Sequence, residues 1–130
     1  MLQKIPIETR ERVQMVDVSA LVARTVRDSG VRAGLCLVFV PHTTAAVTIN
    51  ENADPSVQQD ILSHLERIAP PDGPYAHSEG NGDSHIKASI IGSSVTVIID
   101  EGQLQVGRWQ GIYFCEFDGP RSRQLYVKIL

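Results

Sequence analysis

The run from Gly34 to Val40 constrains the fold more than any other segment, because apolar residues fill successive positions instead of alternate ones. Side chains on a β-strand alternate between its two faces, so this strand is apolar on both. Such a strand lies at the centre of its sheet or is pressed between the sheet and a partner. A second apolar strand is expected over residues 45–50, directly after a polar connection at 41–44. The chain therefore builds its core around sheet.

Two other segments carry the signals of amphipathic helices. Asp17 caps the first, whose apolar residues share one stripe and which closes at residues 28–30. Asp54 caps the second, which ends before Pro70 because proline cannot continue a helix. Both helices are expected to pack one face on the sheet.

The remaining strand candidates are mostly consecutive along the chain. Residues 2–16 are interpreted as a strand or a hairpin, and further strands are expected over 94–100, 111–117 and 124–130. Few helices and many consecutive strands indicate an α+β fold built on antiparallel sheet. Since the chain has 130 residues, we predict a single domain over 1–130.

Composition excludes some partners. The chain has 12 basic and 15 acidic residues, scattered rather than in blocks, which gives no charged surface for a nucleic acid. The first twelve residues alternate charges, so they contain neither a signal-peptide core nor a membrane span, and a cytoplasmic protein is expected. Cys36 and Cys115 lie in apolar runs without CxxC spacing, so we expect two buried free thiols.

The most polar cluster spans residues 77–87 and holds two histidines, two carboxylates, an amide, two glycines and a lysine. Each of these polar side chains loses its hydration on burial and recovers that loss only if another group binds it. Core packing does not account for such a cluster, which therefore favours a binding site. A short helix is expected to begin near His85, capped by Asp83 or Ser84, and to end before Gly92. Its first turn would keep the His85 ring neutral. A capped surface loop is the alternative interpretation.

Three histidines provide possible metal ligands. His77 and His85 offer nitrogen donors beside carboxylates, and His42 is a third donor if the fold brings it close. His64 is left out, because it lies at the edge of a helix stripe where a structural histidine is commoner. We predict a divalent metal ion, zinc or magnesium/manganese, held by His42, His77 and His85.

Neither helix capping nor core packing explains the positions of some other polar residues. Glu51 has no capping role, which favours it as an acid or base. Glu116 points to the same side of its strand as two apolar residues, so it needs a paired cation or a cavity. Arg121 or Arg123 can answer Glu116 or bind a phosphate. Trp109 lies in a glycine-bounded connection, where it anchors the core or a subunit contact.

Five sequence blocks together resemble the YjbQ-like family, often called secondary thiamine-phosphate synthases. The blocks are His42-Thr43-Thr44-Ala45-Ala46, Asn50 to Pro55, His77 to Lys87, Ser94 to Gly102, and Gly107-Arg108-Trp109-Gln110-Gly111-Ile112. The resemblance implies a compact α+β fold with a β-sandwich-like core and a homotrimer with pockets near subunit contacts. It also implies weak joining of the two halves of thiamine phosphate. The family motif positions are His42, Glu51, His77, His85, Lys87, Trp109 and Gln110.

These observations lead to an expected enzyme of thiamine-phosphate synthase type that acts on a small phosphorylated or diphosphate-bearing metabolite. Positive charge around the diphosphate would come from a metal ion and basic side chains. A metal-dependent hydrolase, or a non-enzymatic trimer that binds a metabolite or metal, is the alternative. The predicted catalytic residues are His42, Glu51, His85 and Lys87, and the predicted substrate-binding residues are Thr43, Thr44, Asn81, Gly82, Trp109, Gln110 and Arg121.

Overall fold

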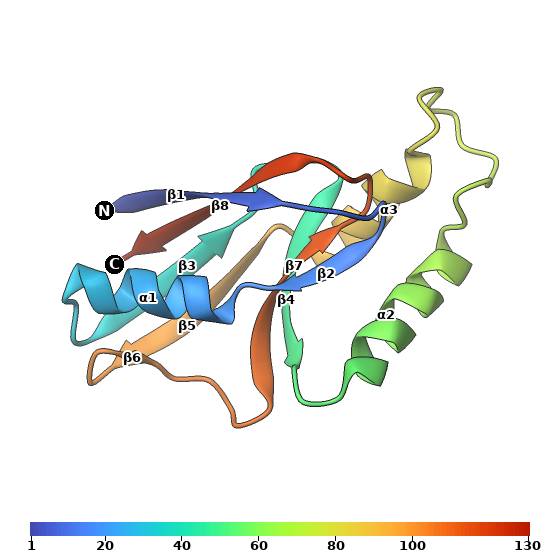
Figure 1. Cartoon of the computed structure of the whole chain (residues 1–130). Helices are drawn as coiled ribbons and strands as arrows, with labels where there is room; N and C mark the ends of the chain where they lie inside the picture. Colours follow the sequence, from blue (N-terminus) through green and yellow to red (C-terminus); the bar gives the residue numbers. More distant parts are fainter.

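Two antiparallel sheets organise the chain, and the computed structural model describes all 130 residues (Figure 1). Sheet A has the strand order β1-β8-β3-β5-β6, and sheet B has the order β2-β7-β4. The α+β prediction is confirmed. The elements are β1 (Leu2–Glu8), β2 (Gln14–Asp17), α1 (Ser19–Ser29), β3 (Gly34–Phe39), β4 (Ala45–Glu51), α2 (Pro55–Ile68), α3 (Gly82–Ile91), β5 (Ser94–Asp100), β6 (Gln103–Leu104), β7 (Gln110–Glu116) and β8 (Ser122–Ile129).

The N-terminal residues do not form the hairpin that was one of the two predictions for 2–16. Strand β1 pairs with β8 along its whole length, from Leu2 opposite Lys128 to Glu8 opposite Ser122. Strand β2 instead pairs with β7 in the other sheet. The chain therefore crosses from sheet A to sheet B between β1 and β2.

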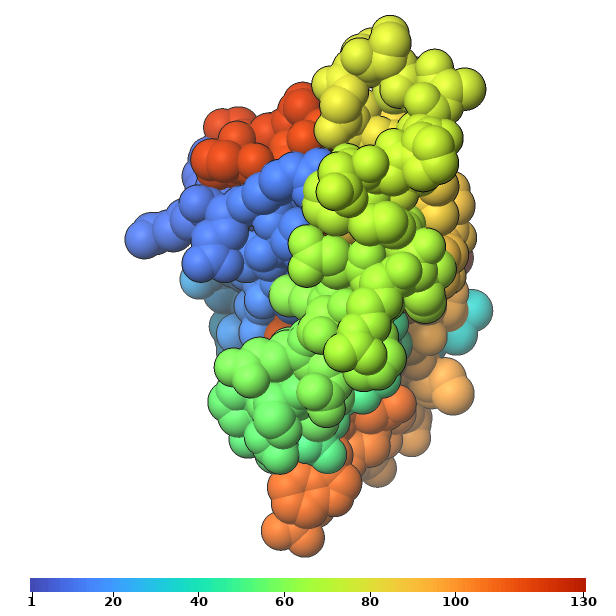
Figure 2. Space-filling view, turned by 90° about the vertical axis from the view of Figure 1, so that its right-hand side faces the viewer, coloured from blue at the N-terminus to red at the C-terminus, as the bar shows by residue number.

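Two apolar layers hold the sheets. The first lies between sheets A and B and includes Val22 of α1, Val38, Phe114 and Leu125. Each such side chain contributes roughly 1.5–3 kcal/mol on burial. The second layer lies on the other face of sheet B, where Cys115 and neighbouring apolar side chains pack under α2 and α3. In Figure 2, α2 and the segment that follows it cover this face.

Strand β7, not β3, is the strand covered on both faces. Its residues from Gly111 to Glu116 are all buried. Strand β3 is central in sheet A, between β8 and β5, as predicted. Its outer face is open, however, because Leu35 and Phe39 remain 43% and 39% exposed.

Local signals set most element ends. The Asp54 carboxylate accepts a hydrogen bond of 2.9 Å from the Ser56 N–H and caps α2, as predicted. Gly30 closes α1 with φ of 72°, a left-handed conformation that glycine adopts without strain. Helix α3 starts earlier than predicted, at Gly82, so that Asp83 and Ser84 lie inside it instead of capping it. No helix in the structure combines the length and the apolar character needed to span a membrane.

The cysteine prediction is confirmed, since Cys36 and Cys115 are buried and unpaired. Burial raises the pKa of the Cys36 thiol to about 11 and that of Cys115 to about 12. Both thiols therefore stay protonated at neutral pH and act as small apolar side chains.

Candidate functional site

A pocket of about 490 Å³ lies between the 41–44 connection and helix α3. The connection contributes His42 and Thr43, and α3 contributes His85 and Ser89, which share a helix face because they are four residues apart. No Asp, Glu, Lys or Arg lines it. The eight lining residues are His42, Thr43, Ala45, His85, Ala88, Ser89, Gly92 and Ser93.

Two hydroxyl groups of this pocket, those of Ser89 and Ser93, were not predicted from the sequence. The i, i+4 spacing from His85 would have identified Ser89, because α3 continues to Ile91. Ser93 carried no local signal. The pairing of β3 with β5 brings it beside the 41–44 connection, since Phe39 lies opposite Ser94 and the Val40 N–H donates to the Ser93 carbonyl at 2.8 Å.

His42 is held by the backbone of β8. Its Nε2 accepts a hydrogen bond of 2.9 Å from the Gln124 N–H. Burial lowers the His42 pKa, and the positive charge of Arg123 lowers it further. The ring is therefore neutral at pH 7, and its proton sits on Nδ1 because Nε2 uses its lone pair as an acceptor.

His85 also forms the wall of an adjoining pocket of about 500 Å³. The His77 and His85 rings lie edge to face there, with centroids 5.0 Å apart. Tyr75 forms another wall and is fixed at its hydroxyl, which donates a 2.5 Å hydrogen bond to the Pro70 carbonyl. Gly82 lets the Tyr75 ring lie against α3, since a Cβ at residue 82 would be 2.6 Å from Tyr75 Cβ.

The donors do not make the predicted metal centre within one chain. No three His, Cys, Asp or Glu side chains gather where they could hold a metal ion. His77 and His85 are close, and the Glu79 carboxylate lies 3.8 Å from His77 Nε2. Nε2 of His42, however, is engaged by Gln124, and its Nδ1 carries the proton. The shell of His42, His77 and His85 is therefore not formed, and metal binding stays a prediction.

Lys87 does not face this pocket, contrary to prediction. It lies two residues after His85, about 200° around the helix, and points to the opposite side of α3. Its Nζ donates a 2.8 Å hydrogen bond to Asp83 Oδ2, and both side chains are buried. Arg12 binds the same carboxylate with hydrogen bonds of 3.0 and 3.2 Å. Burial acts to raise the Asp83 pKa, but the hydrogen bonds from Arg12 and Lys87 outweigh it and hold that pKa below its usual value.

Glu51, Trp109 and Gln110 lie at the wrong end of the fold for the predicted cluster. Glu51 is opposite Gln110 in the β4–β7 register, whereas Ala45, at the pocket, is opposite Glu116. Six residues of strand separate the two ends, about 20 Å. Trp109 is 55% exposed, with the Arg108 guanidinium 4.8 Å from its ring centroid. Within one chain Glu51 therefore does not join His42, and the substrate-binding roles of Trp109 and Gln110 stay predictions.

Three further predicted substrate-binding residues have structural partners. Arg121 Nη2 binds Asp118 Oδ2 at 2.8 Å. Asn81 is buried and donates to the same carboxylate at 2.8 Å, while its Oδ1 has no partner. Thr44 is buried and accepts a 2.9 Å hydrogen bond from Arg123 Nη2. Neither Arg121 nor Lys87 lines the pocket.

The predicted pairing of Glu116 with an arginine is confirmed for Arg123. Arg123 Nε donates to Glu116 Oε1 at 2.8 Å, and its Nη2 donates to Oε2. Burial would raise the Glu116 pKa, but the hydrogen bonds from Arg123, the Asp118 N–H and Thr9 lower it. Glu116 is thus a buried carboxylate that stays ionised.

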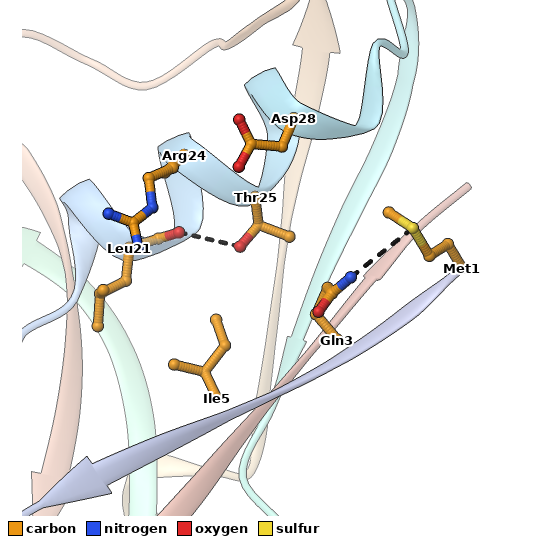
Figure 3. Close-up of a pocket in the computed structure, with 7 residues that line it drawn as sticks. All are labelled: Met1, Gln3, Ile5, Leu21, Arg24, Thr25 and Asp28. Atoms are coloured by element: carbon orange, nitrogen blue, oxygen red, sulfur yellow. Dashed lines mark hydrogen bonds between the residues drawn. The ribbon is translucent and has the colours of Figure 1, made fainter.

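A separate pocket of about 280 Å³ lies between α1 and β1 (Figure 3). Arg24 and Asp28 of α1 and Gln3 of β1 line it together with apolar side chains. It contains no histidine and none of the predicted site residues, so we place the candidate site at the pocket of His42 and His85.

Comparison with known proteins places the chain among relatives of similar length. The sequence profile described as "UPF0047 protein YjbQ-like" matches residues 3–130. A UPF0047 protein of Methanocaldococcus jannaschii is 48% identical over 130 residues, which cover 100% of this chain and 94% of the relative. The UPF0047 protein YugU of Bacillus subtilis is 44% identical, with 100% and 99% covered.

Solved structures agree with the fold. A crystal structure of an uncharacterised yjbq/upf0047 family protein from Clostridium acetobutylicum has a TM-score of 0.97 and 52% identity, and covers 98% of this chain and 99% of its own. A YbjQ-like protein of unknown function from Sulfolobus solfataricus has a TM-score of 0.96 and 32% identity, with 99% and 95% covered.

The expected thiamine-phosphate synthase activity is wrong on these comparisons. The relatives are described only as UPF0047 proteins, and the solved structures as uncharacterised or of unknown function, with no enzymatic activity indicated. The geometry of the site agrees, because the cations that a diphosphate would need, Lys87 and Arg121, are bound to Asp83 and Asp118 elsewhere.

Proposed function

The chain belongs to the UPF0047 YjbQ-like family, and from the geometry of its site we propose that it binds a small, polar, uncharged molecule between His42 and His85. One observation carries the proposal. Two histidines that lie 43 residues apart line one pocket with the hydroxyls of Thr43, Ser89 and Ser93. Pockets with a few convergent polar groups are the usual place for small ligands.

The polar groups define the ligand. His42 offers the Nδ1–H as a donor, since Nε2 is engaged by β8. The Ser89 hydroxyl donates to the His85 carbonyl at 2.9 Å and offers its oxygen as an acceptor, whereas the Thr43 and Ser93 hydroxyls can donate or accept, so together they suit hydroxyl, carbonyl or amide groups. No lysine or arginine lines the pocket, which disfavours a phosphate or diphosphate.

Binding can be tested by ¹H–¹⁵N spectra of labelled protein titrated with two panels of small molecules, one of neutral hydroxyl- and carbonyl-bearing compounds and one of phosphorylated compounds. We expect neutral compounds to shift resonances of the 41–44 connection and of α3. His42→Ala and His85→Ala should each weaken the Kd roughly two- to tenfold, the effect of one hydrogen bond.

His64→Ala is the matched control, because His64 lies exposed on α2, with Nδ1 3.1 Å from the Asp60 carbonyl. It should leave the Kd unchanged. The proposal is wrong if the phosphorylated panel binds this pocket and the neutral panel does not, or if both pocket histidines can be removed without effect on binding.

We further propose that the protein assembles as a homotrimer through the outer face of sheet A. Leu35 and Ile98 lie opposite each other there, 43% and 59% exposed. Phe39 and Tyr126 lie alongside, with ring centroids 6.3 Å apart. An exposed apolar patch on a sheet face is typical of a protein–protein contact. A ring of three copies would cover it if each copy met the next through different surfaces.

Sedimentation equilibrium at micromolar concentration tests the assembly. We expect a mass near three chains of 14.3 kDa for the native sequence and one chain for Ile98→Lys. Ile68→Lys on α2 is the control, because Ile68 is exposed but lies away from sheet A. A native mass near 14.3 kDa would refute the assembly.

A further inference from the structure

The backbone hydrogen bonds that pair β3 with β8 end where a side chain, the His42 imidazole, replaces a backbone acceptor. Leu35 and Leu130 exchange backbone hydrogen bonds of 3.0 and 2.8 Å, and the register continues to Phe39 opposite Tyr126. Two residues further on, the same register would place Pro41 opposite Gln124. Proline has no N–H to donate to the Gln124 carbonyl, so that pair could form only one hydrogen bond, from the Gln124 N–H to the Pro41 carbonyl. The Gln124 N–H donates to His42 Nε2 instead, at 2.9 Å.

The imidazole therefore takes the place of a carbonyl acceptor. An N–H at the end of the ladder gains a hydrogen bond when an acceptor faces it, so β8 is stabilised when the lone pair of Nε2 is turned toward the Gln124 N–H. A neutral ring that accepts at Nε2 must carry its proton on Nδ1. The end of the ladder thus selects one of the two tautomers of His42.

A buried ion pair fastens the same turn to β8. The Arg123 guanidinium precedes Gln124 directly, and its Nη2 donates to Thr44 Oγ1 at 2.9 Å. Its Nε donates to Glu116 Oε1 at 2.8 Å. Arg123 and Glu116 are 6% and 0% exposed, so the pair is shielded from solvent. The Arg123 guanidinium therefore ties Thr44, two positions after His42, to β8. Arg123 itself directly precedes Gln124, the residue that donates to His42.

The carboxylate is fixed in turn. Glu116 also accepts hydrogen bonds of 2.8 Å from Thr9 Oγ1 and 3.0 Å from the Asp118 N–H. Its orientation is therefore set by three separate segments of the chain. A guanidinium held by such a carboxylate cannot swing away from Thr44 without breaking several buried hydrogen bonds.

We propose that Arg123 and Glu116 are positioning residues that lock His42 in the Nδ1–H tautomer, so that the site presents a fixed hydrogen-bond donor to its ligand. The tautomer stands on the hydrogen bonds alone, whereas its use in recognition rests on the function proposed above. The site then selects ligands whose facing atom is an acceptor, namely a carbonyl, ether or hydroxyl oxygen. A ligand that offers only a donor at that atom is rejected, because two donors would face each other.

The tautomer can be measured without any ligand. The chain has four histidines, and long-range ¹H–¹⁵N spectra of ¹⁵N-histidine-labelled protein at mildly alkaline pH distinguish protonated from unprotonated ring nitrogens. Loss of one signal set in His42→Gln assigns His42. We expect a single Nδ1–H form for the native chain.

Arg123→Lys keeps the charge but loses the planar fork that reaches Glu116 and Thr44 together. We expect it to raise the ratio of Nε2–H to Nδ1–H at His42 roughly fivefold, the effect of about one hydrogen bond. Arg121→Lys is the matched control, because Arg121 binds Asp118 and does not contact Thr44. It should leave the tautomer unchanged. Thr44→Val, which removes only the hydroxyl acceptor, gives the same comparison if Arg123→Lys does not fold, and Thr44→Ser should restore the native ratio.

A mixed or Nε2–H tautomer in the native chain overturns the inference, as does an unchanged ratio in both Arg123→Lys and Thr44→Val. The two proposals fail separately. A locked Nδ1–H ring in a protein that binds neither panel refutes only the ligand site, and binding of neutral compounds to a protein with mixed tautomers refutes only the lock.

Discussion

Replacing Asp83 by alanine should remove a large part of the stability of this fold, because it leaves a buried ammonium without its partner. Lys87 is 1% exposed and Asp83 is 0% exposed, and the 2.8 Å contact to Asp83 is the only hydrogen bond that Lys87 Nζ makes. Loss of one partner of a buried pair costs about 3–5 kcal/mol. Arg12 also loses its carboxylate, but its side chain is 38% exposed and water can solvate it. We therefore expect a loss of about 3–5 kcal/mol.

Urea unfolding at pH 7 measures this loss as a lower midpoint at an unchanged m-value. The total stability of a domain is about 5–15 kcal/mol, so the change is readily resolved. Asp28→Ala is the control, since Asp28 lies 3.9 Å from Arg27 with both side chains about 70% exposed, and such surface pairs contribute about 0–1 kcal/mol. The double variant Asp83→Ala/Lys87→Met should recover part of the loss, because no charge is then stranded.

A loss of stability in Asp83→Ala no larger than that in Asp28→Ala would refute the stabilising role of the buried pair, as would a double variant no more stable than Asp83→Ala alone. Asp83→Asn, which keeps the shape and one acceptor oxygen, gives the same comparison if the alanine variant does not fold. Its loss should lie between those of Asp28→Ala and Asp83→Ala.

Three further outcomes are expected. The folded-state pKa values of Asp83 and Glu116 lie below their ordinary values of 3.8 and 4.5, so their contribution is complete above about pH 5 and is lost as the pH falls through the folded-state values; urea midpoints that stay constant from pH 7 to pH 3 would contradict this. Gly82→Ala should destabilise by about 1–3 kcal/mol, because its Cβ would lie 2.6 Å from Tyr75 Cβ, and shifted Tyr75 ring resonances should accompany the loss. Cys115, with its pKa raised to about 12 by burial, should resist alkylation at pH 8 until urea unfolds the chain, and rapid labelling of the native protein would disprove its burial.

Local sequence signals determined most of the helices and strands and one buried ion pair. Asp54 predicted the start of α2 because a carboxylate at that position satisfies an exposed N–H of the first turn, an effect that needs no tertiary contact. The apolar neighbours of Glu116 predicted a buried charge that needs a cation, and Arg123 supplies it. The family blocks identified the family as well, because they are spread from His42 to Ile112.

The tertiary structure decided which of the predicted residues line the pocket. Residues 77–87 were predicted to act as one cluster, yet the helix starts at Gly82 and divides them. His85 faces the pocket, whereas Lys87 is buried against Asp83. Polar composition shows that such groups need partners, but the direction of each side chain depends on where the helix begins and what it packs against.

The two ends of β4 likewise differ in a way that only the tertiary structure shows. Its sequence predicts a strand with polar residues before and after it, and it contains nothing that says which end meets α3. Only the pairing with β7 sets Ala45 opposite Glu116 and Glu51 opposite Gln110, which leaves Glu51 and Trp109 remote from His42. The sequence by itself determined most of the helices and strands, because capping and apolar periodicity act over a few neighbours. The tertiary structure alone decided which polar ends share a pocket, because that depends on strand register between segments far apart in the chain.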